Sequence, residues 1–402
     1  MMSIVVPDRE QHAAPNTREP KRQKRTGSNA GSDNDKKHGL TFTFEPIRVI
    51  GKGFFGIVQH GTWEVKSAKS NESGETGENV FEKISREVAI KSIPKTREYT
   101  SHGEEGFSIS NKPLIMNEIN VMVKLKPLPF INSLVGIIQE PNTVHLVLDY
   151  CPGGDLFGFI ERHRTSAETK IYASTARLDH MRFFMREIVS AVASMHAQHV
   201  MHGDLKCENV LIDRNGHIQL CDFGLAMPDC QENRNFNNAG TELYAAPEQI
   251  QRKMFGKSTD VWTIGYILLF MFFEMSPVPF QRGDTVNRNV ALAEREVRVN
   301  VPQEHTEAPF YNELLDLLRQ VLHVDRNSRP TMEGVQKHRL FQNVVWSDIE
   351  QKRELPPSRP LNDTNPLSEP ASDATYFEDV FTAIPTKPIL VEHCISLNLI
   401  PR

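Results

Sequence analysis

The sequence predicts an α+β fold, in which a strand-rich first part precedes a mainly helical later part and both ends are flexible tails. Three observations predict it. Short β-branched and apolar runs lie between residues 47 and 148, apolar residues recur every three or four positions between 181 and 195, and both ends are polar or proline-rich. With 402 residues and 39% apolar content, the chain can bury a substantial core.

Residues 1–40 are expected to form a disordered N-terminal tail. They are rich in Asn, Ser, Gly, Lys and Arg, and such a segment buries too little apolar surface to offset the entropy of ordering. Met1–Glu10 lacks the basic and apolar regions of a secretory signal, so we expect an intracellular, cytoplasmic protein. The basic run Lys21–Arg25 leaves the nucleus open as an alternative, although short basic runs in polar tails are more often solvated charge.

Residues 41–148 are expected to hold the strands. The β-branched or apolar runs are Ile47–Ile50, Ile57–Val58, Val88–Ile93 and Val144–Leu148. The connection between the second and third runs is long, since Gly56 and Lys91 are 35 positions apart (91 minus 56) and residues 66–79 are rich in Ser, Glu, Asn and Gly. We expect an inserted surface loop near residues 64–84.

Residues 152–345 are expected to be mainly helical. A stripe of apolar residues predicts a helix that ends just before His202: Met181, Phe184, Met185, Ile188, Val189, Val192 and Met195. Val261–Phe273 is too short to span a membrane and predicts a buried core helix. A second polar insertion is expected at residues 162–177. After residue 346, recurrent prolines predict a flexible C-terminal tail to residue 402, in which Tyr376–Phe381 is a transient apolar cluster.

Charge and cysteine content exclude several classes of protein. A net charge of -5 and a pI near 6.3 argue against nucleic acid or an anionic membrane as the main partner. The five cysteines are widely spaced and form no CxxC pair, so free thiols are expected rather than a zinc site or a disulfide framework.

A glycine-rich segment offers a phosphate-binding loop. Gly51-Lys52-Gly53-Phe54-Phe55-Gly56-Ile57-Val58 fits G-x-G-x-x-G-x-V, in which backbone N–H groups can approach phosphates closely. A dinucleotide-binding fold uses similar glycines but opens a helix after them, whereas Ile57 and Val58 continue as a strand. The strand-loop-strand context therefore favours a lid over nucleotide phosphates.

A lysine and a glutamate form the next candidate pair. Lys91 ends the apolar run Val88-Ala89-Ile90-Lys91 and suits the α- and β-phosphates as a point charge. Alone it could be a surface lysine on an edge strand. Glu118 lies in a helix-like stretch 27 residues on (118 minus 91) and is expected to orient it.

The string His202-Gly203-Asp204-Leu205-Lys206-Cys207-Glu208-Asn209, followed by Asp222-Phe223-Gly224, carries the strongest signal. Asp204 can hold an attacking hydroxyl, and Lys206 can neutralise charge on a transferred phosphate. Asn209 and Asp222 offer the oxygen ligands that Mg²⁺ prefers. Each acid singly could be a surface carboxylate, but the whole set at this spacing predicts phosphoryl transfer.

Residues 41–345 resemble the eukaryotic protein-kinase domain, with HGD in place of the usual HRD. The resemblance implies a bilobal fold with a β-rich N-lobe (41–148) and a helical C-lobe (152–345), and it implies ATP and Mg²⁺ as cofactors. It implies further that Leu148, Asp149, Cys151 and Asp155 line the nucleotide site together with Ala89, that Thr241 bridges Asp204 and Lys206, that Glu248 pairs with Arg329, and that Asp260 supports the catalytic loop.

The same resemblance implies serine/threonine specificity, because Lys206 and Gly240-Thr241 follow the pattern of those kinases. Glu208 and Asp155 resemble positions that select basic residues upstream of the target, although Phe270 stands where a further glutamate is often found. Asp-Leu-Lys-Cys-Glu-Asn resembles the calmodulin-dependent-like group. Two alternatives remain: a pseudokinase scaffold, which normally lacks one of the key residues, and a small-molecule or lipid kinase, which Gly240–Glu248 argues against.

Gly203 is the main departure from the family pattern. An arginine there normally pairs with a phosphate on the activation loop, and residues 225–239 contain no Ser, Thr or Tyr. We expect an enzyme that does not use activation-loop phosphorylation and is constitutively poised or controlled by its tails or a partner. The alternative is that Gly203 loosens the loop and slows the enzyme, in which case Gly203→Arg would turn over faster.

Overall fold

The computed structural model describes residues 40–53, 56–68, 81–99, 107–163, 175–228, 242–251, 256–275, 278–281, 287–300, 307–357, 389–391 and 394–396. Residues 40–402 form one compact unit. The expected N-terminal tail and its basic run at residues 21–25 lie outside the described residues, as does the Tyr376–Phe381 cluster.

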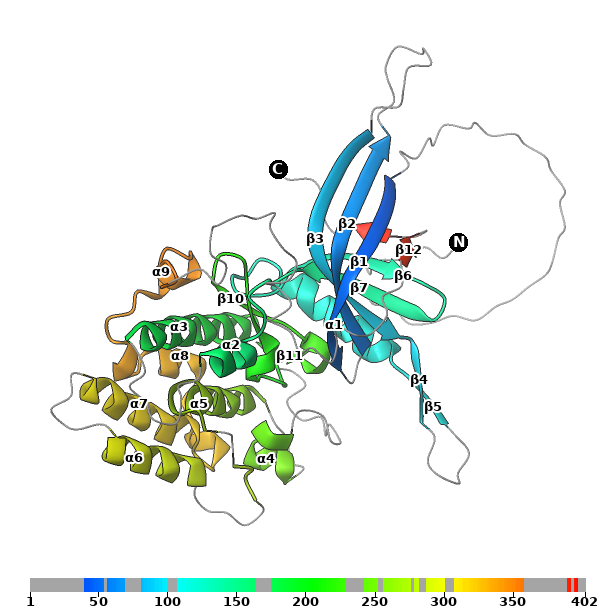
Figure 1. Cartoon of the computed structure of the whole chain (residues 1–402). Coiled ribbons are helices and arrows are strands. Elements are labelled where there is room, and N and C mark those ends of the chain that lie inside the picture. Colours follow the sequence, from blue (N-terminus) through cyan, green and yellow to red (C-terminus); the bar gives the residue numbers. More distant parts are fainter. Residues whose placement is uncertain are drawn as a thin grey trace, which may run out of the picture. The chain divides into compact units, whose positions relative to one another are not determined.

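The first part of the chain forms an antiparallel sheet (Figure 1), as the sequence predicts. Its five long strands are β1 (Leu40–Gly53), β2 (Gly56–Ala68), β3 (Phe81–Pro94), β6 (Leu134–Gln139) and β7 (Thr143–Asp149). They lie in the order β1-β2-β3-β7-β6, and each of these pairings is antiparallel. Helix α1 (Lys112–Leu125) follows the third of these strands in the sequence and precedes the fourth.

The alternation of side chains along β3 determines which of its residues reach the site. Val88 and Ile90 are completely buried in an apolar cluster with Trp63 and Val147. Because successive side chains of a strand point to opposite faces, Ala89 and Lys91 share the other face, where Ala89 joins the main core. The apolar run that ends in Lys91 thus fixes the direction of the lysine side chain.

The polar insertion differs from the expected surface loop. Within 64–84, residues 64–68 extend β2 and residues 81–84 extend β3, with Ala68 opposite Phe81. Residues 69–80 lie outside the description. The flanks are strands because β2 pairs with β1 along one edge and with β3 along the other as far as Ser67, which satisfies their backbone groups.

A hairpin in front of α1 was not predicted. Strands β4 (Thr96–Tyr99) and β5 (Phe107–Ser110) pair antiparallel as a separate two-stranded sheet. Figure 1 shows the hairpin projecting beside α1. Its sequence signal is the short alternation of apolar and polar residues in Phe107–Ser110.

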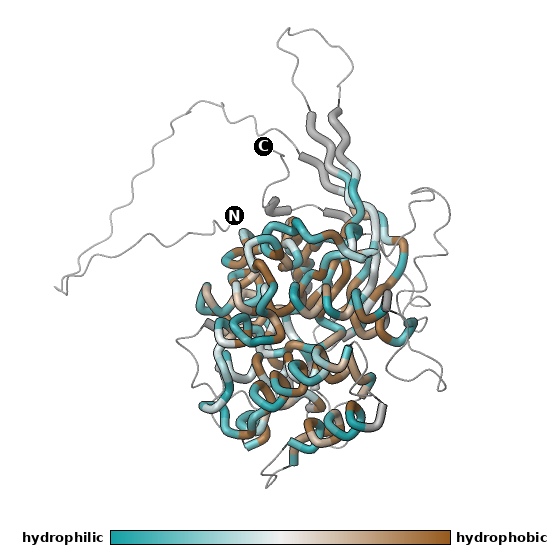
Figure 2. Tube along the Cα trace, turned by 90° about the vertical axis from the view of Figure 1, so that its left-hand side faces the viewer, coloured by the Kyte–Doolittle hydropathy of each residue, from teal (hydrophilic) through white to brown (hydrophobic). Residues whose placement is uncertain are grey.

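The later part is mainly helical, which confirms the prediction (Figure 1). Its helices are α2 (Leu156–Arg162), α3 (Thr175–Ala197), α4 (Pro247–Ile250), α5 (Lys257–Phe273), α6 (Arg288–Asn300), α7 (Ala308–Val321), α8 (Met332–Gln336) and α9 (Trp346–Glu350). Every residue of α5 from Thr259 to Phe273 is buried, as expected of a central core helix. Hydrophobic and hydrophilic residues are mixed along most of the other helices (Figure 2), as expected of amphipathic helices at a protein surface. Of the helices that the structure describes, none is long and apolar enough to cross a membrane.

Of the second insertion, residues 162–177, the two ends are helical: Arg162 ends α2 and Thr175–Arg177 begin α3. Residues 164–174 lie outside the described part of the chain.

Short elements between α3 and α4 carry the His202–Asn209 string and Asp222. They are β8 (Val200–Met201), η1 (Cys207–Asn209), β9 (Val210–Ile212), β10 (Ile218–Leu220), η2 (Phe223–Leu225), β11 (Met227–Pro228) and η4 (Glu242–Tyr244), where η marks a 3₁₀ turn. β9 pairs with β10, and β8 with β11. These pairings bring Asp204 and Asp222, 18 positions apart, to the same side of the helical part.

The chain beyond residue 346 differs from the expected flexible tail. Ile349 of α9 is buried and the ring of Trp346 lies 5.4 Å from that of Phe341, so this segment belongs to the helical part. Strand β12 (Ile389–Val391) pairs with β1, and β13 (Cys394–Ser396) pairs with β6. Short β-branched runs among prolines can thus add to exposed strand edges, whereas residues 358–388 of the predicted tail lie outside the described part of the chain.

Candidate active site

A cleft of about 640 Å³ lies between the sheet and the helical part. Its wall includes nine of the residues expected to contact a nucleotide: Gly51, Lys52, Val58, Ala89, Lys91, Leu148, Asp149, Cys151 and Asp155. It also includes Glu118, which is expected to orient Lys91, and three residues expected to hold metal or phosphate: Lys206, Asn209 and Asp222. Of the predicted site residues, Phe54, Phe55 and Thr241 lie outside the described part of the chain.

The two glycines that flank the tip of the lid pair with each other across the β1–β2 ribbon, Gly53 opposite Gly56. Gly56 requires glycine, because a β-carbon there would lie 2.0 Å from the carbonyl oxygen of Ser92 on β3. The close approach of β2 to β3 thus depends on the third glycine of the motif.

Lys91 connects β3, α1 and η2. Its Nζ donates hydrogen bonds to Oε1 of Glu118 at 2.7 Å and to Oδ1 of Asp222 at 2.8 Å. Burial by itself would lower the pKa of Lys91, but the two carboxylates raise it above its ordinary value, so the amine stays charged. The predicted Lys91–Glu118 pair is present.

The two carboxylates differ in their electrostatics. Burial raises the pKa of Glu118, which is 3% exposed, and the Lys91 ammonium opposes that shift. Burial would also raise the pKa of Asp222, but Lys91 and more distant His202 and Lys206 hold it below its usual range. Asp222 is therefore an anionic oxygen ligand at neutral pH, which suits a divalent cation.

Asp222 has an uncommon backbone conformation. Its φ of 62° and ψ of 71° place it in the left-handed region, which few residues other than glycine adopt. Such strain persists only where the surrounding contacts impose it and concentrates at functional sites. Here it coincides with the contact to Lys91.

The residues of the 202–209 string meet around Asp204. Lys206 Nζ lies 2.9 Å from Asp204 Oδ2, and Asn209 Nδ2 donates to the backbone carbonyl of Asp204 at 2.7 Å. Burial would lower the pKa of Lys206, but Asp204 and, at longer range, Glu208 raise it. A charged lysine thus lies directly beside the carboxylate expected to hold the acceptor hydroxyl.

Asp260 of α5 fixes the backbone at the start of the His202–Asn209 string. Its carboxylate accepts hydrogen bonds from the backbone N–H groups of His202 (2.8 Å) and Gly203 (3.0 Å), and it lies 2.8 Å from Nε2 of His196. Burial would raise the pKa of Asp260, but these hydrogen bonds and the nearby imidazoles lower it. The contacts agree with the supporting role expected of Asp260.

Asp260 predicts pH-dependent stability. Because its pKa is lower in the folded than in the unfolded chain, its stabilising effect is present above about pH 4 and is lost as the pH falls through the folded-state value. We expect the difference in unfolding free energy between wild type and Asp260→Asn, measured with denaturant, to shrink as the pH falls from about 6 to about 3. A difference that stays constant over this range would contradict a charged Asp260.

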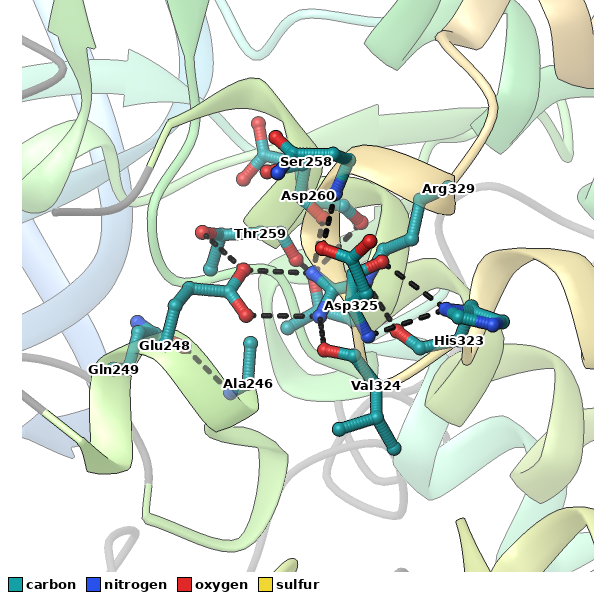
Figure 3. A network of polar contacts seen from close by, with 12 residues as sticks. Ala246, Glu248, Gln249, Ser258, Thr259, Asp260, His323, Val324, Asp325 and Arg329 are labelled. Atoms are coloured by element: carbon teal, nitrogen blue, oxygen red, sulfur yellow. Dashed lines mark hydrogen bonds and ion pairs between the residues drawn. The ribbon is translucent and has the colours of Figure 1, made fainter. Parts of the chain in front are cut away.

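Glu248 and Arg329 form a buried ion pair beneath α4 (Figure 3). Arg329 Nη1 and Nη2 donate to Glu248 Oε1 and Oε2 at 2.7 and 2.8 Å, and Nη1 also donates to the carbonyl of Ser258 at 2.9 Å. The guanidinium carbon lies 4.7 Å from the ring centroid of Trp262. The pair ties α4 to α5 and to the end of η5 (Arg326–Ser328), which Arg329 directly follows.

Sequence reasoning missed one end of the cleft, which is lined by Tyr150, Phe157, Glu161 and Arg162. The available signal was Asp155, which caps α2 by accepting the N–H of Gly158 at 2.7 Å, followed by the apolar spacing of Leu156, Phe159 and Ile160. This pattern predicts a short helix directly after the strand that carries Asp149.

Comparisons with known proteins agree with this geometry. A family model described as "Protein kinase domain" matches residues 72–341. Serine/threonine-protein kinase Sgk2 of Homo sapiens is 29% identical over 344 residues, which cover 84% of this chain and 80% of the relative. Serine/threonine-protein kinase Sgk1 of Mus musculus is 29% identical over 357 residues, which cover 87% of this chain and 70% of the relative. Sgk1 of Xenopus tropicalis is 28% identical over 353 residues, which cover 87% of this chain and 72% of the relative.

Proposed function

The chain belongs to the protein kinase family, and from this we propose that it transfers the γ-phosphoryl group of ATP to serine or threonine hydroxyls of protein substrates. One observation carries the proposal. Lys91, Glu118 and Asp222 meet within hydrogen-bond distance in the same cleft that Lys206 and Asn209 line. The lysine and both aspartates that a scaffold normally lacks are present as Lys91, Asp204 and Asp222, which disfavours a scaffold without catalytic activity.

Each residue has a separate role in the proposed mechanism. Lys91, oriented by Glu118, would hold the α- and β-phosphates of ATP as a fixed positive charge. Asp204 would accept a hydrogen bond from the acceptor hydroxyl and direct it, and Lys206 would neutralise charge that develops on the phosphoryl group. Asp222 and Asn209 would hold Mg²⁺, and Ala89, Leu148 and the backbone of Asp149 and Cys151 would contact the base.

The donor set fits magnesium. Asp222 supplies a carboxylate whose pKa is lowered and Asn209 an amide oxygen, and Mg²⁺ prefers one or two such oxygens together with substrate phosphates. When bound, the ion supplies charge neutralisation between the phosphates. The protein's own contribution is alignment, since Lys91 and Asp260 fix both sides of the cleft.

A peptide assay tests the proposal. Purified full-length protein with ATP and Mg²⁺ should transfer phosphate to peptides that contain serine or threonine, and Asp204→Ala should lower the rate by about a hundredfold or more. Lys337→Ala, at the exposed position directly after α8, is the matched control and should retain the wild-type rate. Transfer that does not depend on Asp204 would leave only a scaffold, and transfer to lipids or small metabolites but not to peptides would indicate the other alternative.

We also propose that the enzyme works without a phosphate on its activation loop. Two observations favour this: residues 225–239 contain no hydroxyl side chain, and Gly203 cannot pair with a phosphate. Asp260, rather than a phosphate-bound arginine, fixes the backbone of His202 and Gly203, next to Asp204.

Phosphatase treatment tests that proposal. The wild-type protein should keep its rate of peptide phosphorylation after complete dephosphorylation, verified by mass spectrometry. A large loss of activity, traced to a phosphate within residues 225–244, would overturn it.

The expected likeness to the calmodulin-dependent-like group gains no support from the Sgk1 and Sgk2 relatives described above. The wider assignment to serine/threonine kinases agrees with the names of these relatives. A preference for basic residues upstream of the target stays a proposal, based on the exposed Glu208 beside Lys206.

A further inference from the structure

An asparagine in the wall of the cleft has a buried polar atom without a partner. Asn132 lies just before β6, lines the cleft and is 3% exposed. In the part of the chain that the structure describes, its Oδ1 accepts no hydrogen bond. Buried polar groups are nearly always paired in native proteins, so an exception in a binding cleft points to a ligand that supplies the missing donor.

The other buried polar side chains of the cleft are already paired. Lys91 and Glu118 bond to each other, and Asn209 donates to the carbonyl of Asp204. Among the described residues that line the cleft, Asn132 alone has a buried side-chain oxygen or nitrogen without a partner. The unused hydrogen-bonding capacity therefore belongs to this one position.

Backbone contacts place Asn132 next to the residues that are proposed to contact the base. The N–H of Asn132 donates to the carbonyl of Leu220 at 2.9 Å, at the end of the strand that leads to Asp222. The carbonyl of the next residue, Ser133, accepts the N–H of Asp149 at 3.1 Å. Asn132 thus lies between the segment that carries Asp222 and the segment whose backbone would contact the base, so a base in the cleft would present an edge to its side chain.

An asparagine amide can distinguish one purine from another. Its oxygen accepts a hydrogen bond and its nitrogen donates, which matches the adenine edge that carries the 6-amino donor and the N7 acceptor. Guanine presents two acceptors at the same places, O6 and N7, and its O6 would face the amide oxygen with no proton between them. The terminal torsion of an asparagine is broad, so the amide can turn both of its groups toward the base.

We propose that Asn132 is a specificity-determining residue that reads the adenine of ATP, with Oδ1 accepting a hydrogen bond from the 6-amino group and Nδ2 donating one to N7. The inference rests on the nucleotide binding of the proposed function and deepens it, because it adds a side-chain contact to the backbone contacts of Asp149 and Cys151. A contact of this bidentate kind discriminates between bases by about ten- to a hundredfold.

Nucleotide analogues that differ from ATP in single groups test the inference. The full-length protein is titrated in the presence of Mg²⁺ with ATP, GTP or 7-deaza-ATP, in which a C–H group replaces N7, and calorimetry gives the dissociation constants. For wild type we expect GTP to bind about ten- to a hundredfold more weakly than ATP. We expect 7-deaza-ATP to bind about three- to tenfold more weakly, because it loses one hydrogen bond.

Asn132→Leu removes both hydrogen-bonding groups and keeps a similarly branched side chain. In this variant the ratio for 7-deaza-ATP should fall to near one, and the ratio for GTP should fall severalfold, since the backbone contacts still distinguish the bases. Purine riboside triphosphate, which lacks the 6-amino group, isolates Oδ1: its loss of affinity relative to ATP should be about three- to tenfold smaller in Asn132→Leu than in wild type. Because each ratio is taken within one protein, a general change in affinity cancels.

Thermal unfolding without nucleotide distinguishes this role from a structural one. Asn132→Leu should unfold at the same temperature as wild type or a higher one, because it removes an unpaired buried polar atom. Asn111→Leu is the matched control: Asn111 is 8% exposed, and its Nδ2 donates to the carbonyl of Pro94 at 2.9 Å. That variant should unfold at a lower temperature and keep the wild-type nucleotide ratios.

The outcomes separate the inference from the proposed function. A wild-type ratio near one for 7-deaza-ATP, or ratios that are the same in Asn132→Leu, would overturn the role of Asn132 while peptide phosphorylation stands. If the ratios change as expected but no peptide is phosphorylated above the level of Asp204→Ala, the proposed phosphoryl transfer fails and the role of Asn132 in binding stands. A protein that binds no ATP would contradict both.

Discussion

Replacing Arg329 with leucine is expected to lower the free energy of unfolding by about 3–5 kcal/mol, because it leaves the Glu248 carboxylate buried without its partner. The side chains are 0% and 4% exposed, and the arginine also satisfies the carbonyl of Ser258. Unfolding in denaturant, followed by tryptophan fluorescence, measures the change in free energy. Trp262, whose ring contacts the Arg329 guanidinium, contributes a fluorescence signal from the site of the substitution.

Two controls test the cause of that loss. Arg329→Leu combined with Glu248→Leu removes both charges and should recover part of the stability, since an apolar pair can replace a buried ion pair. Lys337→Ala breaks the exposed pair with Glu333 and should have little effect. An Arg329→Leu protein as stable as wild type would show that the pair is not a structural tie.

Replacing Gly203 with arginine is expected to slow phosphate transfer by about tenfold or more. Gly203 has a φ of 79°, and a β-carbon there would lie 2.6 Å from the carbonyl oxygen of Leu225. The left-handed conformation alone costs about 1–2 kcal/mol for other residues, and relief of the contact must move the backbone next to Asp204. The structure therefore argues against the alternative in which Gly203→Arg gives a faster enzyme.

A graded series measures this effect. Gly203→Ala adds only the β-carbon and should already lower kcat at saturating ATP and peptide. Gly216→Ala is the matched control: Gly216 has a φ of 89° but lies in the turn between β9 and β10. It should cost stability without lowering kcat. A Gly203→Arg enzyme that turns over faster than wild type would restore the loosening hypothesis.

The sequence was most informative where the chemistry depends on the identity of a few residues. Lys91 could be placed because it ends a short apolar run typical of a strand, and Asp260 because its segment resembles the central helix of the family, and the structure places both as expected. The distances between Lys91, Glu118 and Asp222 could not be derived, since residues from three separate segments are brought together only by the packed fold.

Non-local pairing explains the misses. The β4–β5 hairpin is short and mostly polar, and the β12 and β13 segments have too few residues to indicate their partners. The contact between Phe157 and Phe270 was also not predicted, because nothing in the segment around Phe157 shows that Phe270, 113 positions away (270 minus 157), stacks on its ring.

The pairing of β12 and β13 has a consequence for how the sheet closes. These strands are separated by two residues, which extend over about 11 Å at most, yet they flank opposite edges of five strands that would span about 29 Å from one to the other if laid flat. The sheet must therefore curl until its two edges approach each other, with β12 on one edge and β13 on the other.

This closure depends on contacts between residues very far apart in the chain: Phe42 pairs with Val391, 349 positions away (391 minus 42). During synthesis, β1 and β6 keep their edges open until the ribosome has made residue 396. Such long-range pairing is slow to form, and open strand edges invite aggregation in the meantime. The first strands of the seven-stranded sheet are thus synthesised early, but the sheet is complete only after β12 and β13 have been synthesised and have paired.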